Sequence, residues 1–213
     1  MEELSLHPPN TRRTRRSDLY AAILVPVFYF GAQLAAAPFY PGYSFAQDTA
    51  SMLGTTSSRH PWIFNLGAIL TGLAGLVGAF GLFRALRAVT WTTLAALVAF
   101  CVVVNGVLSL KAGLFPMPDP RHASWQFLMF PILIAPLLLL IALWSKGRVI
   151  RTYLLCNLFA LLATLPFMFH RVAPVLAEGT MQRVFALVVF VPVGVAAYAL
   201  AWPTTHSDSA TLQ

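Results

Sequence analysis

The side chains of this chain that could do acid and base chemistry gather in two stretches. The stretch YPGYSFAQDTASMLG (40–54) contains Asp48, and GLFPMPDPRHASW (113–125) contains Asp119 and His122. A carboxyl group and an imidazole in a partly buried position can serve as general acid and general base. Asp48, Asp119 and His122 are therefore the candidate catalytic residues.

Polar and aromatic side chains near these acids are candidates for binding a ligand. Arginine binds phosphate through its bidentate guanidinium fork. The candidate ligand-binding residues are Tyr43, Ser51, Asn65, Asn105, Arg121, Trp125 and His170. A second interpretation stays open, because cationic and aromatic side chains also anchor helix ends among lipid headgroups, and amides also join membrane helices by hydrogen bonds.

Each candidate acid also has a purely structural explanation. Asp48 would lie in the first turn of a short helix, where a negative charge complements the helix dipole. Asp119-Pro120 follows the pattern of a helix start, with Asp as N-cap and Pro at the first helical position. The second stretch is therefore expected to be a connector between two helices, whether or not it also reacts.

Metal and cofactor chemistry is not expected. His60, His122 and His170 fall in three separate loops, and no short-range pair of ligands accompanies them. No His-Glu-x-x-His helix or nucleophile-elbow motif occurs either. We predict no metal site and no cofactor.

The elements that position these residues are membrane helices. The chain of 213 residues is 58% hydrophobic and 10% charged, against roughly 25% charged in a soluble domain. Six uncharged runs are each long enough for the ~17–25 residues that span a bilayer. They cover 19–37, 61–83, 88–110, 123–145, 152–169 and 184–205. We predict an all-α polytopic membrane protein with six transmembrane helices.

The runs divide the chain into a basic cytoplasmic tail (1–18), one membrane domain (19–205) and a second cytoplasmic tail (206–213). The net charge of +7 does not indicate nucleic-acid binding, because no exposed fold remains to carry a basic stripe. Nine Lys and Arg lie in the N-terminal tail and the two loops on its side, and five lie on the other side. The positive-inside rule then places both termini inside, and all three candidate catalytic residues outside.

The first outer loop is expected to contain a short amphipathic helix on the membrane surface. Ser44 and Gln47 form a Ser-x-x-Gln capping pattern, and Gly54 ends the apolar run that follows. Helix two, with small residues at four-residue spacing from Gly67 to Ala79, is expected to be central, because such residues allow close helix approach.

Prolines and amides indicate a cavity open to the outer leaflet. A proline within a helix frees a backbone carbonyl, which a neighbour or water must then satisfy. The prolines inside the predicted helices are Pro26, Pro131, Pro136, Pro166 and Pro192. The amides Gln33, Asn65 and Asn105 lie near the outer ends.

Three stretches carry a family resemblance: YPGYSFAQDTASMLG, FNLGAILTGLAGL and GLFPMPDPRHA. The chain resembles a bacterial and archaeal family of membrane proteins known as domain of unknown function 998. The resemblance implies six helices in a prokaryotic inner membrane and no established activity. It favours a role for the motif residues Tyr43, Asp48, Ser51, Gly113, Phe115, Asp119 and His122.

Three functions fit these observations. The first is binding or handling a lipid-like or isoprenoid amphiphile in the outer cavity. The second is an enzyme using outer Asp and His residues on a lipid-like substrate. The third is a structural partner of another membrane protein, whose identity the sequence does not give. Ion transport is not favoured, because no charged residue lies at mid-membrane.

Overall fold

A computed structural model describes residues 11–168 and 177–202, and within these ranges every regular element is helical. The α-helices are α1 (Thr11–Ala36), α2 (Pro61–Leu86), α3 (Thr92–Leu114), α4 (Met129–Ala142), α5 (Arg148–Met168) and α6 (Glu178–Ala201). The short 3-10 helices are η1 (Ala37–Phe39), η2 (Ala50–Gly54) and η3 (Gln126–Leu128). The predicted all-α class is confirmed.

The helices are those of a multi-pass membrane protein. Among the described residues, five segments, in α1, α2, α3, α5 and α6, are long and apolar enough to cross a membrane. Helix α4 is apolar but has 14 residues. At 1.5 Å per residue it rises about 21 Å, less than the ~30 Å of a hydrocarbon core. The predicted count of six spans therefore depends on α4.

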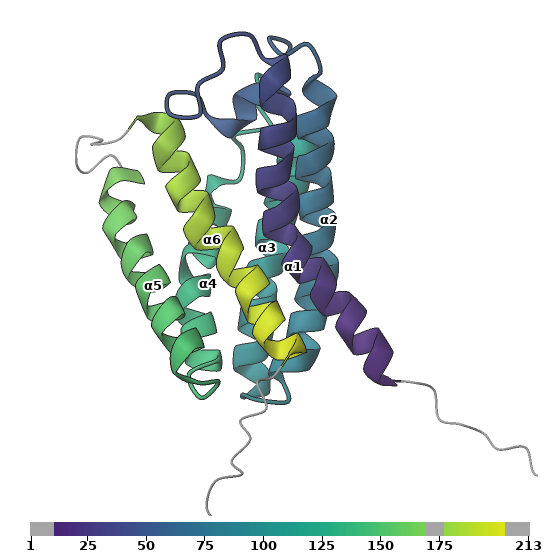
Figure 1. Cartoon of the computed structure of the whole chain (residues 1–213), viewed down its shortest axis with the longest axis vertical. Coiled ribbons are helices and arrows are strands. Elements are labelled where there is room, and N and C mark those ends of the chain that lie inside the picture. Colours follow the sequence, from purple (N-terminus) through teal and green to yellow (C-terminus); the bar gives the residue numbers. More distant parts are fainter. Residues whose placement is uncertain (1–10, 169–176, 203–213) are drawn as a thin grey trace, which may run out of the picture.

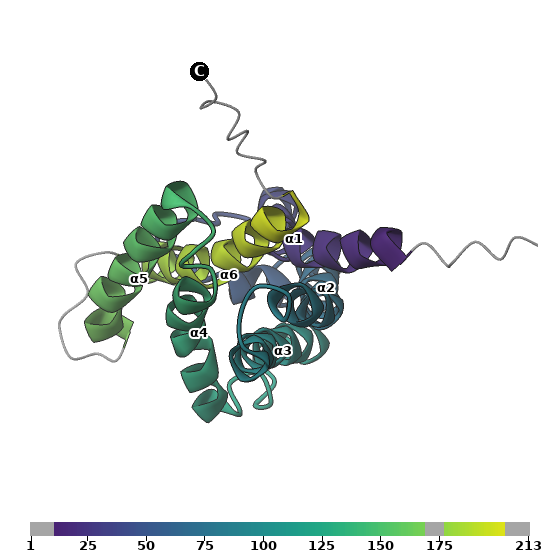
Figure 2. The same ribbon diagram turned by 90° about the horizontal axis from the view of Figure 1, so that it is seen from below.

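The six helices form one bundle whose middle layer is α4 and α6 (Figure 1). Seen along the bundle, α1, α2 and α3 group on one side and α5 lies on the other (Figure 2). The first and last helices meet where the chain enters and leaves the bundle, since the rings of Tyr20 and Trp202 lie 5.5 Å apart. We call the opposite end, which carries the 37–60 and 115–125 connections, the loop end.

Helix α2 packs closely against both α1 and α3, as its small residues predict. A Cβ atom on Gly78 would lie 2.7 Å from the backbone of Ala22 in α1. A Cβ atom on Gly72 would lie 2.6 Å from the carbonyl oxygen of Gly106 in α3. Glycine is required at these contacts because a Cβ atom would collide with the neighbouring helix. Burial of apolar surface contributes little to helix association in lipid, so close approach of the backbones matters more.

The segment 44–54, predicted to be a short helix in the first outer loop, is helical only in its second half. Residues 44–48 form a capped turn, in which Ser44 N–H donates to the Asp48 carboxylate at 2.8 Å. The helix that follows, η2, buries Ala50 and Leu53 against Ala36 and Phe64. The apolar side of this segment packs against α1 and α2 and is not free to face lipid. Its position at the membrane surface stays a prediction.

The start of the fourth helix was also predicted too early. Asp119 caps a turn and not a helix: His122 N–H donates to its carbonyl, and Asp119 N–H donates to that of Pro116. Trp125 then has a φ of 66°, in the left-handed region, which interrupts any helix. Helix α4 begins only at Met129, which places Pro131 in its first turn, where proline causes no kink.

All five tryptophans lie at or next to a helix end, as expected of rings at the headgroup level. Each is exposed on the surface of the bundle. Trp62 is the second residue of α2, Trp91 precedes α3, Trp125 precedes η3, Trp144 follows α4 and Trp202 follows α6.

Candidate functional site

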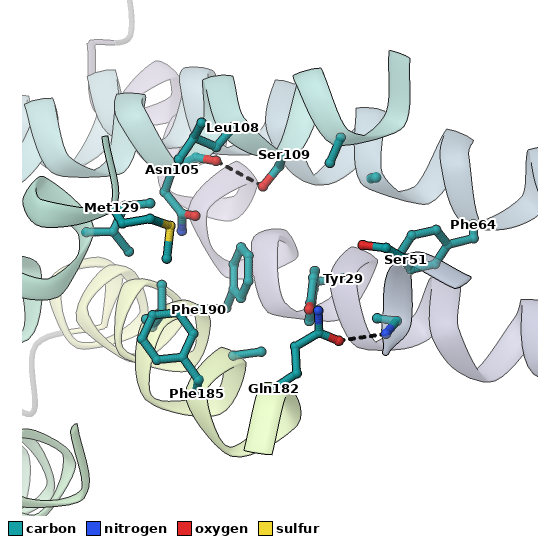
Figure 3. Close-up of a pocket in the computed structure, with 16 residues that line it drawn as sticks. Tyr29, Ser51, Phe64, Asn105, Leu108, Ser109, Met129, Gln182, Phe185 and Phe190 are labelled. Atoms are coloured by element: carbon teal, nitrogen blue, oxygen red, sulfur yellow. Dashed lines mark hydrogen bonds between the residues drawn. The ribbon is translucent and has the colours of Figure 1, made fainter. Parts of the chain in front are cut away.

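A cavity of about 270 Å³ lies in the loop-end half of the bundle, beneath η2. Helices α1, α2, α3, α4 and α6 and the short helix η2 all contribute to its wall (Figure 3). Its volume is just below the ~300–1,000 Å³ of typical small-molecule sites. It can therefore hold a chain or a small group, but not an entire lipid.

Most of the wall is apolar. Aromatic side chains from three helices face the space, and small residues on α2, α3 and α6 leave it open. The apolar lining residues are Ala50, Phe64, Ala68, Leu108, Ala112, Met129, Ile132, Phe185, Ala186, Val189 and Phe190. The ring of Phe190 stacks on that of Tyr29, with centroids 4.2 Å apart, which fixes one side of the wall.

A few polar groups interrupt this wall. Ser109 donates to the carbonyl of Asn105 one turn earlier at 2.9 Å, and Gln182 accepts the Ala50 N–H at 2.6 Å (Figure 3). The carboxamide of Asn105 is different. Asn105 is only 8% exposed, and its side chain makes no hydrogen bond within the described residues. Its polar atoms are not fully enclosed by protein, so a polar group in the cavity can bond to them.

Ser51 lines the cavity from η2. It also contacts His122, which lies in the 115–125 connection, called the second connection below. The Oγ atom of Ser51 lies 3.1 Å from Nε2 of His122, and Nδ1 of the same ring lies 2.9 Å from the carbonyl oxygen of Phe115. Two of the sequence-predicted residues, 71 positions apart, are therefore brought together. Both are partly exposed.

The first loop is fastened to α6 by Arg183. Its Nη1 donates to the carbonyls of Phe45 and Asp48 at 2.6 and 2.9 Å, and its Nη2 donates to the Tyr43 hydroxyl. Burial raises the pKa of Tyr43, and the positive charge of Arg183 opposes that rise. Tyr43 in turn donates to the Thr49 carbonyl at 3.2 Å, so it holds the loop and does not line the cavity.

Asp48 does not reach the cavity either. Its carboxylate accepts the Ser44 N–H, and within the described residues no hydrogen bond or ion pair joins it to Asp119 or His122. The candidate catalytic acids thus do not converge in the described structure. Asp48 closes the turn at 44–48 and does not lie in the first turn of a helix, where its sequence position would have let it complement the helix dipole.

Asp119 and Arg121 form an exposed pair on the second connection. Arg121 Nη2 lies 2.7 Å from Asp119 Oδ2, and its guanidinium carbon lies 3.9 Å from the ring centroid of Phe115. Hydrogen bonds from the Arg121 side chain and backbone lower the pKa of Asp119 to about 2. The pair shapes the turn that presents His122, and it lies outside the cavity wall.

Two further predicted residues, Asn65 and Trp125, also lie outside the cavity wall. Asn65 donates to the Gly54 carbonyl at 3.1 Å and ties η2 to α2. Trp125 is exposed, and its ring lies 5.4 Å from the ammonium of the buried Lys111. His170 lies outside the described residues. Of the ten predicted site residues, Ser51 and Asn105 line the cavity.

Sequence reasoning missed Tyr29, Ser109 and Gln182 in the cavity wall. Tyr29 is one aromatic among several in an apolar run, and Ser109 satisfies itself within its own helix. A usable signal existed for Gln182, since an amide in the first turns of an apolar helix needs a partner.

Comparison with known proteins gives a family and no activity. Residues 23–199 match the model of a family described as a protein of unknown function (DUF998). No curated protein and no solved structure matches the chain.

Proposed function

The chain belongs to the DUF998 family, whose function is unknown, and we propose that it binds the chain of a lipid-like or isoprenoid amphiphile in the cavity beneath η2. We place the protein in a prokaryotic inner membrane with six spans and both termini inside. In this orientation the loop end faces outward, and the ligand enters from the outer leaflet.

The observation that carries the proposal is the Asn105 carboxamide, which has no hydrogen-bond partner among the described residues and lies in a mostly apolar cavity. Apolar walls bind a hydrocarbon chain, and a few placed polar groups fix its orientation. Asn105 on α3 and Gln182 on α6 supply such groups from different helices. The volume of about 270 Å³ suits part of one chain, with the headgroup left outside.

The test is mass spectrometry of lipids that copurify with the protein in a mild detergent. Ala112→Leu narrows the cavity from α3 and should abolish enrichment of a specific amphiphile. Ala96→Leu makes the same change at an exposed position of α3 and should leave enrichment intact. Asp48→Asn is a second control, since Asp48 does not line the cavity. Equal lipid profiles for wild type and Ala112→Leu would contradict the proposal.

A further inference from the structure

The imidazole of His122 is held in one tautomer by its two neighbours. The Phe115 carbonyl oxygen, 2.9 Å from Nδ1, can only accept a hydrogen bond, so Nδ1 carries the proton of the neutral ring. Nε2 is then the acceptor, and the Ser51 hydroxyl, 3.1 Å away, donates to it. This is the arrangement in which a histidine can take the proton of a serine hydroxyl.

The position of Ser51 would bring this hydrogen bond next to a ligand bound in the cavity. Ser51 lines the cavity, and Figure 3 shows its hydroxyl oxygen directed toward the other labelled side chains. The second serine of the wall, Ser109, donates to a carbonyl of its own helix and has no base beside it. Of the two serine hydroxyls in the cavity wall, only that of Ser51 is therefore paired with an imidazole.

We propose that Ser51 and His122 are a nucleophile and general base that cleave a carboxylic ester in an amphiphile, a reaction that rests on chain binding in the cavity. The apolar wall would hold the acyl chain, and its carbonyl carbon would lie beside Ser51. The Phe115 carbonyl takes the orienting place that a carboxylate has in a serine triad. The polar alcohol portion of the ester would project toward the loop end.

The reaction balances with water as the only co-reactant. Oγ of Ser51 bonds to the ester carbonyl carbon while its proton moves to Nε2 of His122. The tetrahedral intermediate collapses, the bond to the alcohol oxygen breaks, and that oxygen takes the proton from Nε2. Water then attacks the acyl-Ser51 ester with His122 again as base, which releases a carboxylic acid and restores the hydroxyl. The carboxamides of Asn105 and Gln182 provide N–H donors on the same wall for a developing oxyanion.

A fluorophosphonate with a long alkyl chain tests the nucleophile directly. Wild-type protein in detergent should form one covalent adduct, located on the peptide containing Ser51. Ser51→Ala should form none, and Ser57→Ala, which removes an exposed serine hydroxyl of the same loop outside the cavity wall, should react like wild type. Hydrolysis of p-nitrophenyl octanoate should follow the same order.

The base is tested with His122→Gln, whose side-chain amide can still bond to Ser51 but cannot accept its proton. The labelling rate should fall by about 10²-fold or more. If His122→Gln reacts as fast as wild type, His122 is only a tether between the two connections and the inference fails. An adduct on Ser109 or another serine, or no adduct at all, also overturns it.

Two measurements keep the outcome interpretable. Copurified lipid is assayed in each variant, so that loss of labelling can be distinguished from loss of lipid binding. A wild type that enriches lipid but resists the fluorophosphonate refutes catalysis alone. If Ser51→Ala does not fold, Ser51→Cys replaces it, and alkylation of the new thiol by iodoacetamide should slow when His122→Gln is added. An unchanged alkylation rate rejects the pair.

Discussion

The guanidinium group of Arg183 lies against Asp48 but binds its backbone carbonyl, at 2.9 Å, and not its carboxylate. The Asp48 carboxylate is turned toward the Ser44 N–H instead. Arg183 is in neither of the two ion pairs formed among the described residues, and its charge meets carbonyl dipoles, the Tyr43 hydroxyl and the Phe45 ring, 4.9 Å from its guanidinium carbon. Backbone recognition of this kind fixes the path of a loop irrespective of its side chains.

Arg183→Lys should therefore loosen the first loop although it conserves the charge. A lysine ammonium cannot reach the several acceptors that the planar guanidinium fork serves together. Each lost hydrogen bond to a charged group costs on the order of 2 kcal/mol. We expect a lower melting temperature in detergent and faster amide hydrogen exchange across residues 40–54.

Arg121→Lys is the matched control, because Arg121 is an exposed arginine on the second connection. It should change neither the melting temperature nor exchange in 40–54 noticeably, since exposed ion pairs contribute little. If both lysine variants behave alike, the loop is held by its own packing and not by Arg183.

Much of the fold was predictable, because hydropathy directly reports membrane helices. The apolar runs locate every α-helix, and the glycines of α2 indicate its contacts with both neighbours. The ends of the helices at the 37–60 and 115–125 connections were harder to predict from the sequence. The start of α4 depends on the backbone conformation at Trp125. The conformation of the 44–54 segment depends on the burial of Leu53 against the bundle. Both are tertiary effects that a capping pattern does not contain.

The candidate site was predictable in composition but not in pairing. The sequence indicated Ser51, Asn105 and His122 separately, on three different segments. Their relation requires the η2 segment to fold over the bundle and the second connection to turn back toward it. No local spacing encodes the Ser51–His122 contact. Asp48 and Asp119 do not meet in the structure, because each carboxylate accepts a hydrogen bond from a backbone N–H of its own turn.

Gly72→Val should destabilise the bundle more than the same substitution at a glycine on the surface of the bundle. The new side chain would begin 2.6 Å from the Gly106 carbonyl oxygen and 2.7 Å from the Leu110 nitrogen, and backbone atoms cannot move aside cheaply. Overpacking of this kind costs about 1–3 kcal/mol. Gly31→Val on α1, where a Cβ atom meets nothing within 4 Å, is the control. Thermal unfolding in detergent compares the two, and equal melting temperatures would argue against close α2–α3 packing.

Asp119 should titrate at unusually low pH. Its pKa is about 2 in the folded chain, below the ordinary 3.8, because Arg121 donates hydrogen bonds to it. A group with a lowered folded pKa stabilises the fold fully above its ordinary pKa and loses that contribution as pH falls from about 4 to about 2. Asp119→Asn should remove this small pH-dependent part of the melting temperature, and Arg121→Gln should remove only the share due to the side chain, because the backbone N–H of residue 121 still donates to Asp119. Carboxyl carbon NMR of labelled Asp should show the low pKa in wild type, and a midpoint near 3.8 would contradict the pairing.

Cysteine labelling can decide whether α4 crosses the membrane. In a background with Cys101→Ala and Cys156→Ser, single cysteines replace Ala123, which precedes α4, or Ser145, which follows it; both positions are exposed. If α4 spans with the proposed orientation, a membrane-impermeant maleimide should label Ala123→Cys in intact cells and label Ser145→Cys only after lysis. Gln47→Cys in the first outer loop is the outside control. Labelling of both Ala123→Cys and Ser145→Cys from the same side would mean that this 14-residue helix re-enters the face it left, that only five helices cross, and that the two termini lie on opposite sides.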